Sequence, residues 1–257
     1  MIKTDYTDIV VEVSGQIGII KFNRPDYLNA FGGRLLPETI NAFRELNEHP
    51  DTVLTVLTGA GRFFSSGWDI RSIELIRTII DHRKVFVLAL NGPATGGGAA
   101  WFLGLADTVL AASTAHLHMP FSALALVPEN GSIRTLAHSL GVHRANDLLI
   151  YGKRVTAGEL RAWGTVSEVF PAGDFHAEVR GFLERQLEEN DGESMMIAKK
   201  LGTAPLRSER LLAAYEAMDA LYERMVEGAP TARFVKKIQG LQEKKEKKEK
   251  KEKQSKL

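Results

Sequence analysis

Residues 85–107 read VFVLALNGPATGGGAAWFLGLAD, and this stretch is the strongest indication of the fold. Val85–Leu90 is a continuous apolar run, which favours a buried strand. The glycine-bearing turn that follows leads into Ala94–Ala106, an apolar segment that would be buried if it were helical. A strand that leads into a helix through a short turn is the unit from which α/β domains are built.

Similar units lie on both sides of this stretch. The helical pattern at Arg34–Asn47 repeats its apolar residues at about 3.6-residue spacing, and the order of elements alternates between strand and helix. The first half therefore predicts an α/β domain with its strands in the core. Besides Val85–Leu90, the expected strands are Asp8–Val13, Ile17–Phe22, Val53–Thr58 and Thr108–Ala112.

After about residue 130 the pattern becomes mainly helical, with one further short strand expected at Thr165–Phe170. We interpret this part as a helical extension that packs on the α/β body or on a partner subunit. The expected helices are Ser132–Leu140, Arg144–Tyr151, Ala157–Trp163, Phe175–Glu188 and Glu209–Val226.

The composition excludes several classes of protein. The 257 residues include no cysteine, which rules out disulfide frameworks, thiolate metal sites and cysteine nucleophiles. The apolar content of 44% suits a globular domain with an ample core. No apolar run reaches the roughly 18 residues of a membrane-spanning helix, and the N-terminus lacks the layout of a signal peptide. We therefore expect a soluble protein.

The net charge of +1 is an average over two unlike parts. Residues 243–257 carry eight Lys and four Glu, so the rest of the chain carries 25 basic and 28 acidic residues. A mildly acidic body argues against nucleic-acid binding, which needs a basic face.

The tail, residues 241–257, is expected to be a solvated appendage. It ends in Ser255, Lys256 and Leu257, the peroxisomal address, which predicts a peroxisomal location and binding to the import receptor.

Two glycine-bearing turns are the best candidates for chemistry. Phe63–Asp69 reads FFSSGWD and residues 91–98 read NGPATGGG, and each lies between a strand and a helical stretch. Unpaired backbone N–H groups at such turns can converge on one developing oxyanion. The GxSxG, Walker A and HExxH motifs are all absent from the sequence.

These turns, together with MPFSALALVPENG at residues 119–131 and YGKRVTAGELRAWGTVSEVF at residues 151–170, resemble the signatures of the crotonase (enoyl-CoA hydratase/isomerase) superfamily. The resemblance extends over roughly residues 8–240. It implies a ββα spiral core, a helical C-terminal trimerisation region at about residues 175–240, and assembly as a homotrimer or hexamer. Residues 1–240 would form the acyl-CoA-binding catalytic domain.

The resemblance also implies a set of site residues. The oxyanion hole falls on the backbone N–H groups of Trp68 and Gly97. The substrate is an acyl-CoA thioester, whose CoA is not a separate cofactor, and neither a cofactor nor a metal is expected. The implied contacts to substrate and CoA are Asn29, Ala30, Ser66, Gly67, Asp69, Ile70 and Phe121.

The position of the acidic residue selects the reaction. Hydratases of this superfamily use two glutamates, which would fall near Ala99 or Ala100 and at Phe121, and this chain has no acid there. An acid follows instead at Glu129, an arrangement that resembles the peroxisomal Δ3,Δ2-enoyl-CoA isomerases. One glutamate in an apolar pocket can move a proton from C2 to C4 of a 3-enoyl thioester. The resemblance therefore implies such an isomerase, acting in fatty-acid β-oxidation, with Glu129 as its catalytic residue.

Two other interpretations stay open. One is a hydratase/isomerase-family enzyme of peroxisomal fungal secondary metabolism, which would process a toxin or siderophore acyl chain. The other is a non-catalytic scaffold that binds RNA or an acidic partner through its Lys-rich tail.

The chain also departs from the family pattern. Only 15 residues separate Asp69 from Val85, where a longer helical cover is common, and the segment from Gly98 to Asp107 is one residue longer.

Overall fold

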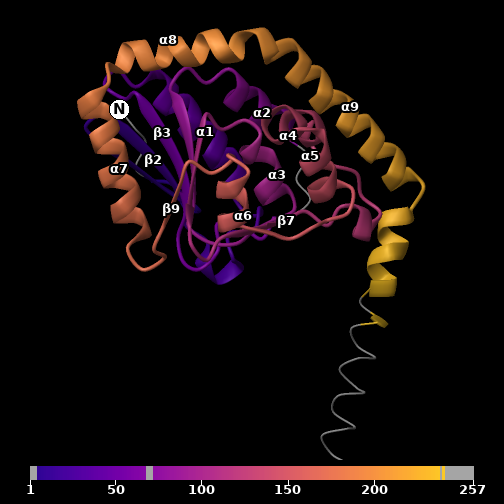
Figure 1. Ribbon diagram of the computed structural model, residues 1–257. Helices are drawn as coiled ribbons and strands as arrows, with labels where there is room; N and C mark the ends of the chain where they lie inside the picture. Colours follow the sequence, from indigo (N-terminus) through magenta and orange to yellow (C-terminus); the bar gives the residue numbers. More distant parts are fainter. Residues whose placement is uncertain (1–4, 68–71, 238, 241–257) are drawn as a thin grey trace, which may run out of the picture.

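The computed structural model describes residues 5–67, 72–237 and 239–240 (Figure 1). Within this part of the chain, one sheet has the strand order β1-β2-β3-β4-β6-β9 and a smaller sheet has the order β5-β7-β8. The strands are β1 Ile9–Ser14, β2 Ile17–Phe22, β3 Leu54–Gly59, β4 Val85–Leu90, β5 Ala94–Thr95, β6 Thr108–Ala112, β7 His116–His118, β8 Val155–Thr156 and β9 Glu168–Phe170. The helices are α1 Leu35–Glu48, α2 Ile73–Ile80, α3 Gly97–Leu103, α4 Ser132–Leu140, α5 Val142–Leu149, α6 Ala157–Ala162, α7 Phe175–Glu189, α8 Gly192–Thr203 and α9 Arg207–Val226, with short 3-10 turns at Pro25–Tyr27, Ser122–Leu124 and Ala204–Leu206.

The inner strands β3, β4 and β6 of the large sheet are buried on both faces. β1 pairs with β2 in the antiparallel sense, and the remaining neighbours pair in parallel. Along β4, Phe86 and Leu88 point into the cluster that contains the apolar side chains of α1 and α3, whereas Val87 points into a second cluster with α7. Parallel strands that are covered on both sides read as continuous apolar runs, which explains the sequence of β4.

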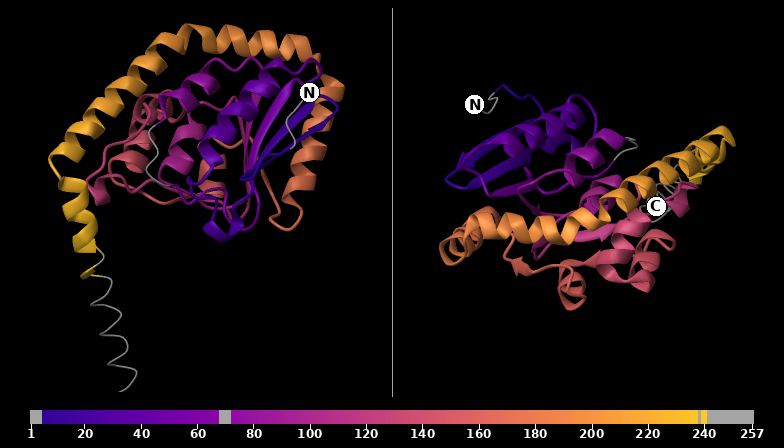
Figure 2. Two further views of the ribbon diagram at one scale, coloured as in Figure 1. Left: turned by 180° about the vertical axis from the view of Figure 1, so that it is seen from behind. Right: turned by 90° about the horizontal axis from the view of Figure 1, so that it is seen from above.

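The C-terminal helices run around this body. Figure 1 shows α7 beside the sheet, with α8 and α9 forming an arch over the body, and the view from behind in Figure 2 shows the same arch. α9 packs against α2 and α4, and a further helical stretch follows at residues 229–237. The α/β architecture and the helical C-terminal region that the sequence predicts are confirmed.

Two elements predicted from the sequence differ in the structure. The predicted helix Ala94–Ala106 is shorter, because Ala94 and Thr95 pair with Leu117 and His118 as strand β5, and the helix begins only at Gly97. The predicted strand Thr165–Phe170 is reduced to β9, whose three residues are those that find partners on β6. The other predicted elements agree with the structure to within two residues at each end.

The tail that begins at residue 241 and the tripeptide Ser255, Lys256 and Leu257 lie outside the described residues. Within the described part of the chain, none of the helices combines the length and the apolar character needed to cross a membrane.

Candidate active site

The two glycine-bearing turns run side by side. Ser65 forms an isolated parallel bridge with Ala94. The amide of Phe64 donates to the carbonyl of Pro93 at 3.0 Å, and the amide of Thr95 donates to the carbonyl of Ser65 at 2.9 Å. These bonds pair the segments that follow β3 and β4, beyond the ends of the two strands. The two turns therefore lie next to each other.

Close backbone contact explains the glycines at that point. Gly67 has φ of +78°, a conformation that other residues seldom adopt. A Cβ atom on Gly67 would lie 2.5 Å from the carbonyl oxygen of Thr95. A Cβ atom on Gly98 would lie 2.5 Å from the hydroxyl oxygen of Ser65. That hydroxyl is itself fixed, because it donates to the carbonyl of Asn29 at 2.8 Å and accepts from the amide of Gly67 at 3.1 Å.

A cavity of about 560 Å³ opens beside these turns. One wall is formed by Ser66 and Gly97 from the two turns, and another by Phe121 and Glu129 from the segment that precedes α4. The remaining lining comes from Thr95, Gly96, Pro120, Leu124 and Leu126, and from the C-terminal residues Met225, Pro230, Thr231 and Phe234. The cavity is therefore mostly apolar, with one carboxylate among its described lining residues.

Gly97 is the first residue of α3. The amides of the first turn of a helix have no acceptor within the helix, so the Gly97 N–H can serve a ligand. The other predicted oxyanion donor, Trp68, and the predicted contacts Asp69 and Ile70 lie outside the described residues. The described residue next to Trp68 is Gly67, which borders Gly97, since a Cβ on Gly67 would lie 3.5 Å from the Gly97 nitrogen.

Glu129 is almost completely buried, with 3% of its surface exposed. Its loop turns sharply into α4, because Asn130 and Gly131 both have positive φ and the amide of Ser132 donates to the Glu129 carbonyl at 2.9 Å. Nε1 of Trp101 donates a hydrogen bond to Oε2 of Glu129 at 3.0 Å. The turn and this bond together aim the carboxylate at the cavity.

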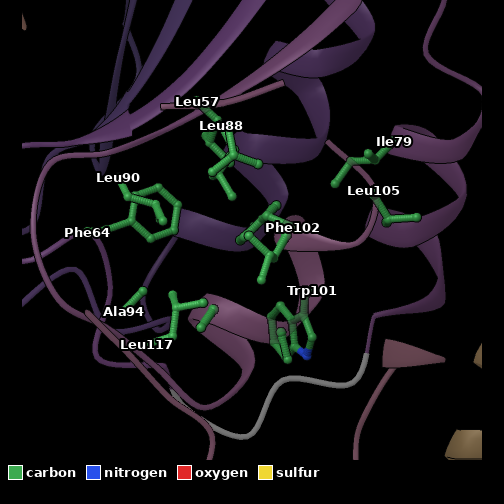
Figure 3. Packing of buried hydrophobic residues seen from close by; sticks show 14 of the residues in the cluster. Leu57, Phe64, Ile79, Leu88, Leu90, Ala94, Trp101, Phe102, Leu105 and Leu117 are labelled. Carbon is green, nitrogen blue, oxygen red and sulfur yellow. The ribbon is translucent and has the colours of Figure 1, made fainter. Parts of the chain in front are cut away.

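Sequence reasoning missed Trp101. Its side chain is 1% exposed and belongs to the main apolar cluster, part of which is shown in Figure 3. The only signal in the sequence was a tryptophan within an apolar segment expected to be buried, because a buried indole needs an acceptor for its N–H group. The acceptor lies 28 residues away along the chain.

The chain is similar to known proteins over most of its length. A family model described as enoyl-CoA hydratase/isomerase matches residues 12–254. The chain belongs to the enoyl-CoA hydratase/isomerase family. It is 37% identical over 214 residues to enoyl-CoA delta isomerase 2 of Rattus norvegicus, a match that covers 75% of this chain and 54% of the relative. It is 34% identical over 191 residues to the peroxisomal enoyl-CoA delta isomerase 3 of Mus musculus, which covers 67% of this chain and 60% of that protein.

A solved structure, the enoyl-CoA hydratase/isomerase from Pseudoalteromonas atlantica T6c, is similar with a TM-score of 0.82 and 25% identity. The match covers 90% of this chain and 98% of that one. The resemblance to the crotonase superfamily and its fold is therefore confirmed. The chain spans only about half the length of the Rattus norvegicus isomerase that it matches.

Within this family, the places expected for the two hydratase acids are occupied by apolar side chains. Ala99 and Ala100 are buried inside α3. Phe121 is 3% exposed and contributes its ring to the cavity wall. The described part of the site thus offers one acid, Glu129, rather than a pair.

The predicted CoA-contact residues divide into two groups. Ser66, next to Gly67, lines the cavity, as does Phe121. Asn29 instead is fully buried, and its side chain accepts from the amide of Arg24 and donates to the carbonyls of Ala60 and Phe63, all at 2.9 Å. Asn29 therefore holds the loop in place. Ala30 is half-buried beside it, and its carbonyl accepts from the Arg24 guanidinium at 2.9 Å.

Proposed function

We propose that this protein is a Δ3,Δ2-enoyl-CoA isomerase, which moves the double bond of a 3-enoyl-CoA to the 2-trans position. The observation that carries the proposal is the position of Glu129. It is the carboxylate among the described residues that line the cavity, and the cavity also borders Gly97. One acid beside one oxyanion donor suits a proton transfer within the substrate.

The proposed reaction needs one base and no added water. The Glu129 carboxylate takes a proton from C2 of the 3-enoyl thioester, which leaves a dienolate. The thioester oxygen then carries negative charge, and the amide N–H groups of Gly97 and Trp68 would stabilise it. The carboxylic acid returns the proton to C4, which conjugates the double bond with the thioester and restores the carboxylate.

Hydration is disfavoured by the same geometry. Adding water to a 2-enoyl thioester requires a group that activates the water as well as a group that delivers a proton. Ala99, Ala100 and Phe121 offer neither group, and the cavity that Phe121 lines is largely apolar. The two delta isomerases named above are relatives whose names agree with this assignment.

A substrate panel tests the proposal. Purified protein is supplied separately with cis-3-enoyl-CoA, trans-3-enoyl-CoA and trans-2-enoyl-CoA, and conjugation and hydration are measured independently. We expect the 3-enoyl esters to become conjugated without uptake of water. Hydration of the 2-enoyl ester without conversion of the 3-enoyl esters would reject the isomerase in favour of a hydratase.

We also propose a peroxisomal location, which is supported by the peroxisomal relative from Mus musculus. The test is an N-terminal fluorescent fusion with and without Ser255, Lys256 and Leu257. Overlap with a peroxisomal marker that requires these three residues is the expected result, and an unchanged distribution after their removal would contradict the proposal.

A further inference from the structure

Trp101 contacts both halves of the site. Atoms Cε2 and Cζ2 of its ring lie 2.5 Å from the position that a Cβ on Gly97 would occupy, so the ring covers that glycine directly. Nε1 of the same ring lies 2.8 Å from that position and donates to Oε2 of Glu129 at 3.0 Å. One indole therefore bridges the predicted oxyanion donor and the predicted base.

The indole is held firmly. Its exposed fraction is 1%, and its ring packs on Phe31 with centroids 5.0 Å apart and an angle of 53° between the planes. A larger residue at position 97 would collide with the ring, so the glycine and the tryptophan depend on each other. A rigid donor costs little entropy when it binds its acceptor, which suits it to fix the orientation of a carboxylate.

We propose that Trp101 is a positioning residue, which orients the Glu129 carboxylate and assigns the transferred proton to Oε1. The inference rests on the proposed function, because it names how the base of that reaction is set. An indole N–H can only donate. In a carboxylic acid the carbonyl-type oxygen is the better acceptor, so the bond to Oε2 favours protonation of Oε1. The proton taken from C2 and returned to C4 would then stay on one oxygen, with no rotation of the carboxyl group between the two steps.

The ordinary alternative is that Glu129 merely satisfies a buried indole. Both explanations predict the 3.0 Å contact, and they differ in the effects expected from its loss. A structural contact should affect stability and all functions of the site together. A positioning contact should affect the proton-transfer step and leave binding nearly unchanged.

The first experiment observes the contact without any turnover. The chain has three tryptophans, so a ¹⁵N spectrum should show three indole N–H signals, and Trp101→Phe identifies the one that belongs to Trp101. We expect that signal to shift with pH in the wild type and to lose this pH dependence in Glu129→Gln. A Trp101 signal with the same pH dependence in both proteins would overturn the proposed link between the indole and the carboxylate.

The second experiment measures the role of the contact. In Trp101→Phe, which keeps an aromatic ring but lacks the donor, we expect kcat for 3-enoyl-CoA to fall about 10- to 100-fold with KM changed by less than about threefold. The acidic limb of the pH–kcat profile should move to higher pH, because the lost bond favoured the charged carboxylate. Trp163→Phe is the matched control, since that ring lies under Arg144 and Lys153 at the surface, outside the cavity.

A double variant completes the test. Trp101→Phe combined with Glu129→Gln should be no slower than Glu129→Gln alone, because the indole acts through the acid. An additional loss in the double variant, or a Trp101→Phe enzyme with wild-type kcat and pH profile, would overturn the proposal.

Exchange of the C2 proton of a saturated acyl-CoA in D₂O separates this result from the proposed function. If the wild type exchanges that proton but does not isomerise, the isomerase assignment fails, and the effect of Trp101→Phe on exchange still decides the role of Trp101.

Discussion

A Cβ atom on Gly67 would lie 3.5 Å from the backbone nitrogen of Gly97. Although they are far apart in the sequence, these two residues bring the turn after β3 and the turn before α3 into direct contact. The approach depends on the glycine at position 67, because a Cβ atom there would lie 2.5 Å from the carbonyl oxygen of Thr95 in the second turn. It places the predicted oxyanion donor Gly97 beside the residue that precedes Trp68, and this convergence underlies the proposed chemistry.

The first prediction concerns the space between the turns. Gly98→Ala would place a methyl group 2.5 Å from Oγ and 2.7 Å from Cβ of Ser65, and 3.1 Å from the amide nitrogen of Gly67. We expect the two turns to separate, with a loss of about 1–3 kcal/mol in the free energy of unfolding and a decrease of about 100-fold in kcat/KM. Chemical denaturation and initial rates measure the two effects.

The control for that change is Gly158→Ala. Gly158 lies in the first turn of α6 with no atom within 4 Å of its Cβ position. Its replacement should leave activity unchanged and stabilise the protein by roughly 0.5–1 kcal/mol. Equal activity in the two alanine variants would show that close approach of the turns is not required.

The second prediction concerns the dependence of stability on pH. Burial, followed by the positive charges of Lys199, Lys84 and Arg83, lowers the pKa of His82 well below its usual value. The unfolded chain therefore binds a proton at His82 more readily than the folded chain. The contribution of His82 to the free energy of unfolding is complete above about pH 6.5. As the pH falls below that value, the free energy of unfolding decreases by up to about 1.4 kcal/mol per pH unit.

Urea denaturation of the wild type and of His82→Gln, at a series of pH values from about 7.5 down to about 5, would measure this slope. The variant should show a flatter dependence than the wild type, whatever its absolute stability. His143→Gln, which changes an exposed side chain, is the control and should retain the wild-type slope. Identical slopes in wild type and His82→Gln would disprove the linkage.

The third prediction concerns the acyl chain. Phe234 lines the cavity from the C-terminal helical stretch, whose Arg233 guanidinium donates to the carbonyl of Ala123 at 3.3 Å. We expect Phe234→Ala to raise KM for long 3-enoyl-CoA esters several-fold more than for short ones, because only long chains would reach this ring. Val235 is also exposed but lies outside the cavity lining, so Val235→Ala should alter neither value. An equal effect on short and long esters would remove Phe234 from the acyl pocket.

The fourth prediction concerns assembly, for which we propose a homotrimer or a hexamer built from trimers. Leu212, Tyr215, Tyr222 and Val226 are between 54% and 71% exposed and follow one side of α9. An exposed apolar stripe of this kind marks an interaction surface. We expect light scattering to give three or six times the monomer mass, and Tyr222→Glu combined with Val226→Glu to reduce it.

Tyr151→Glu is the control for assembly, since Tyr151 is 79% exposed and is not part of α9. It should leave the mass unchanged. A monomeric wild-type protein would contradict the proposed assembly.

Much of the fold was predictable from the sequence because its inner strands are buried on both faces. β4 and β6 have the bounds that their apolar runs predict. α8 was missed because none of its residues is fully buried, so it carries no apolar stripe to reveal it. β5 was mistaken for part of a helix because its pairing with β7 joins residues that are distant in sequence.

The site was predictable only in part. The glycines at positions 67 and 97 and the acid at position 129 stand in recognisable motifs. In the structure Gly97 and Glu129 line one cavity, and Gly67 lies beside Gly97. The hydrogen bond from Trp101 was not predictable, because its direction depends on how α3 packs against the segment before α4. The sequence also pointed to Asn29 as a ligand contact, whereas its side chain is bonded within the protein.

In the proposed isomerisation, Glu129 carries the proton. The direct measurement is the turnover of trans-3-enoyl-CoA by Glu129→Gln, alongside its thermal unfolding and its affinity for a saturated acyl-CoA. The amide has nearly the size of the carboxyl group and can still accept the Trp101 hydrogen bond, so folding and binding should be retained. We expect turnover to fall by about 1,000-fold or more. A folded variant that binds acyl-CoA and converts the 3-enoyl ester at the wild-type rate would contradict the account.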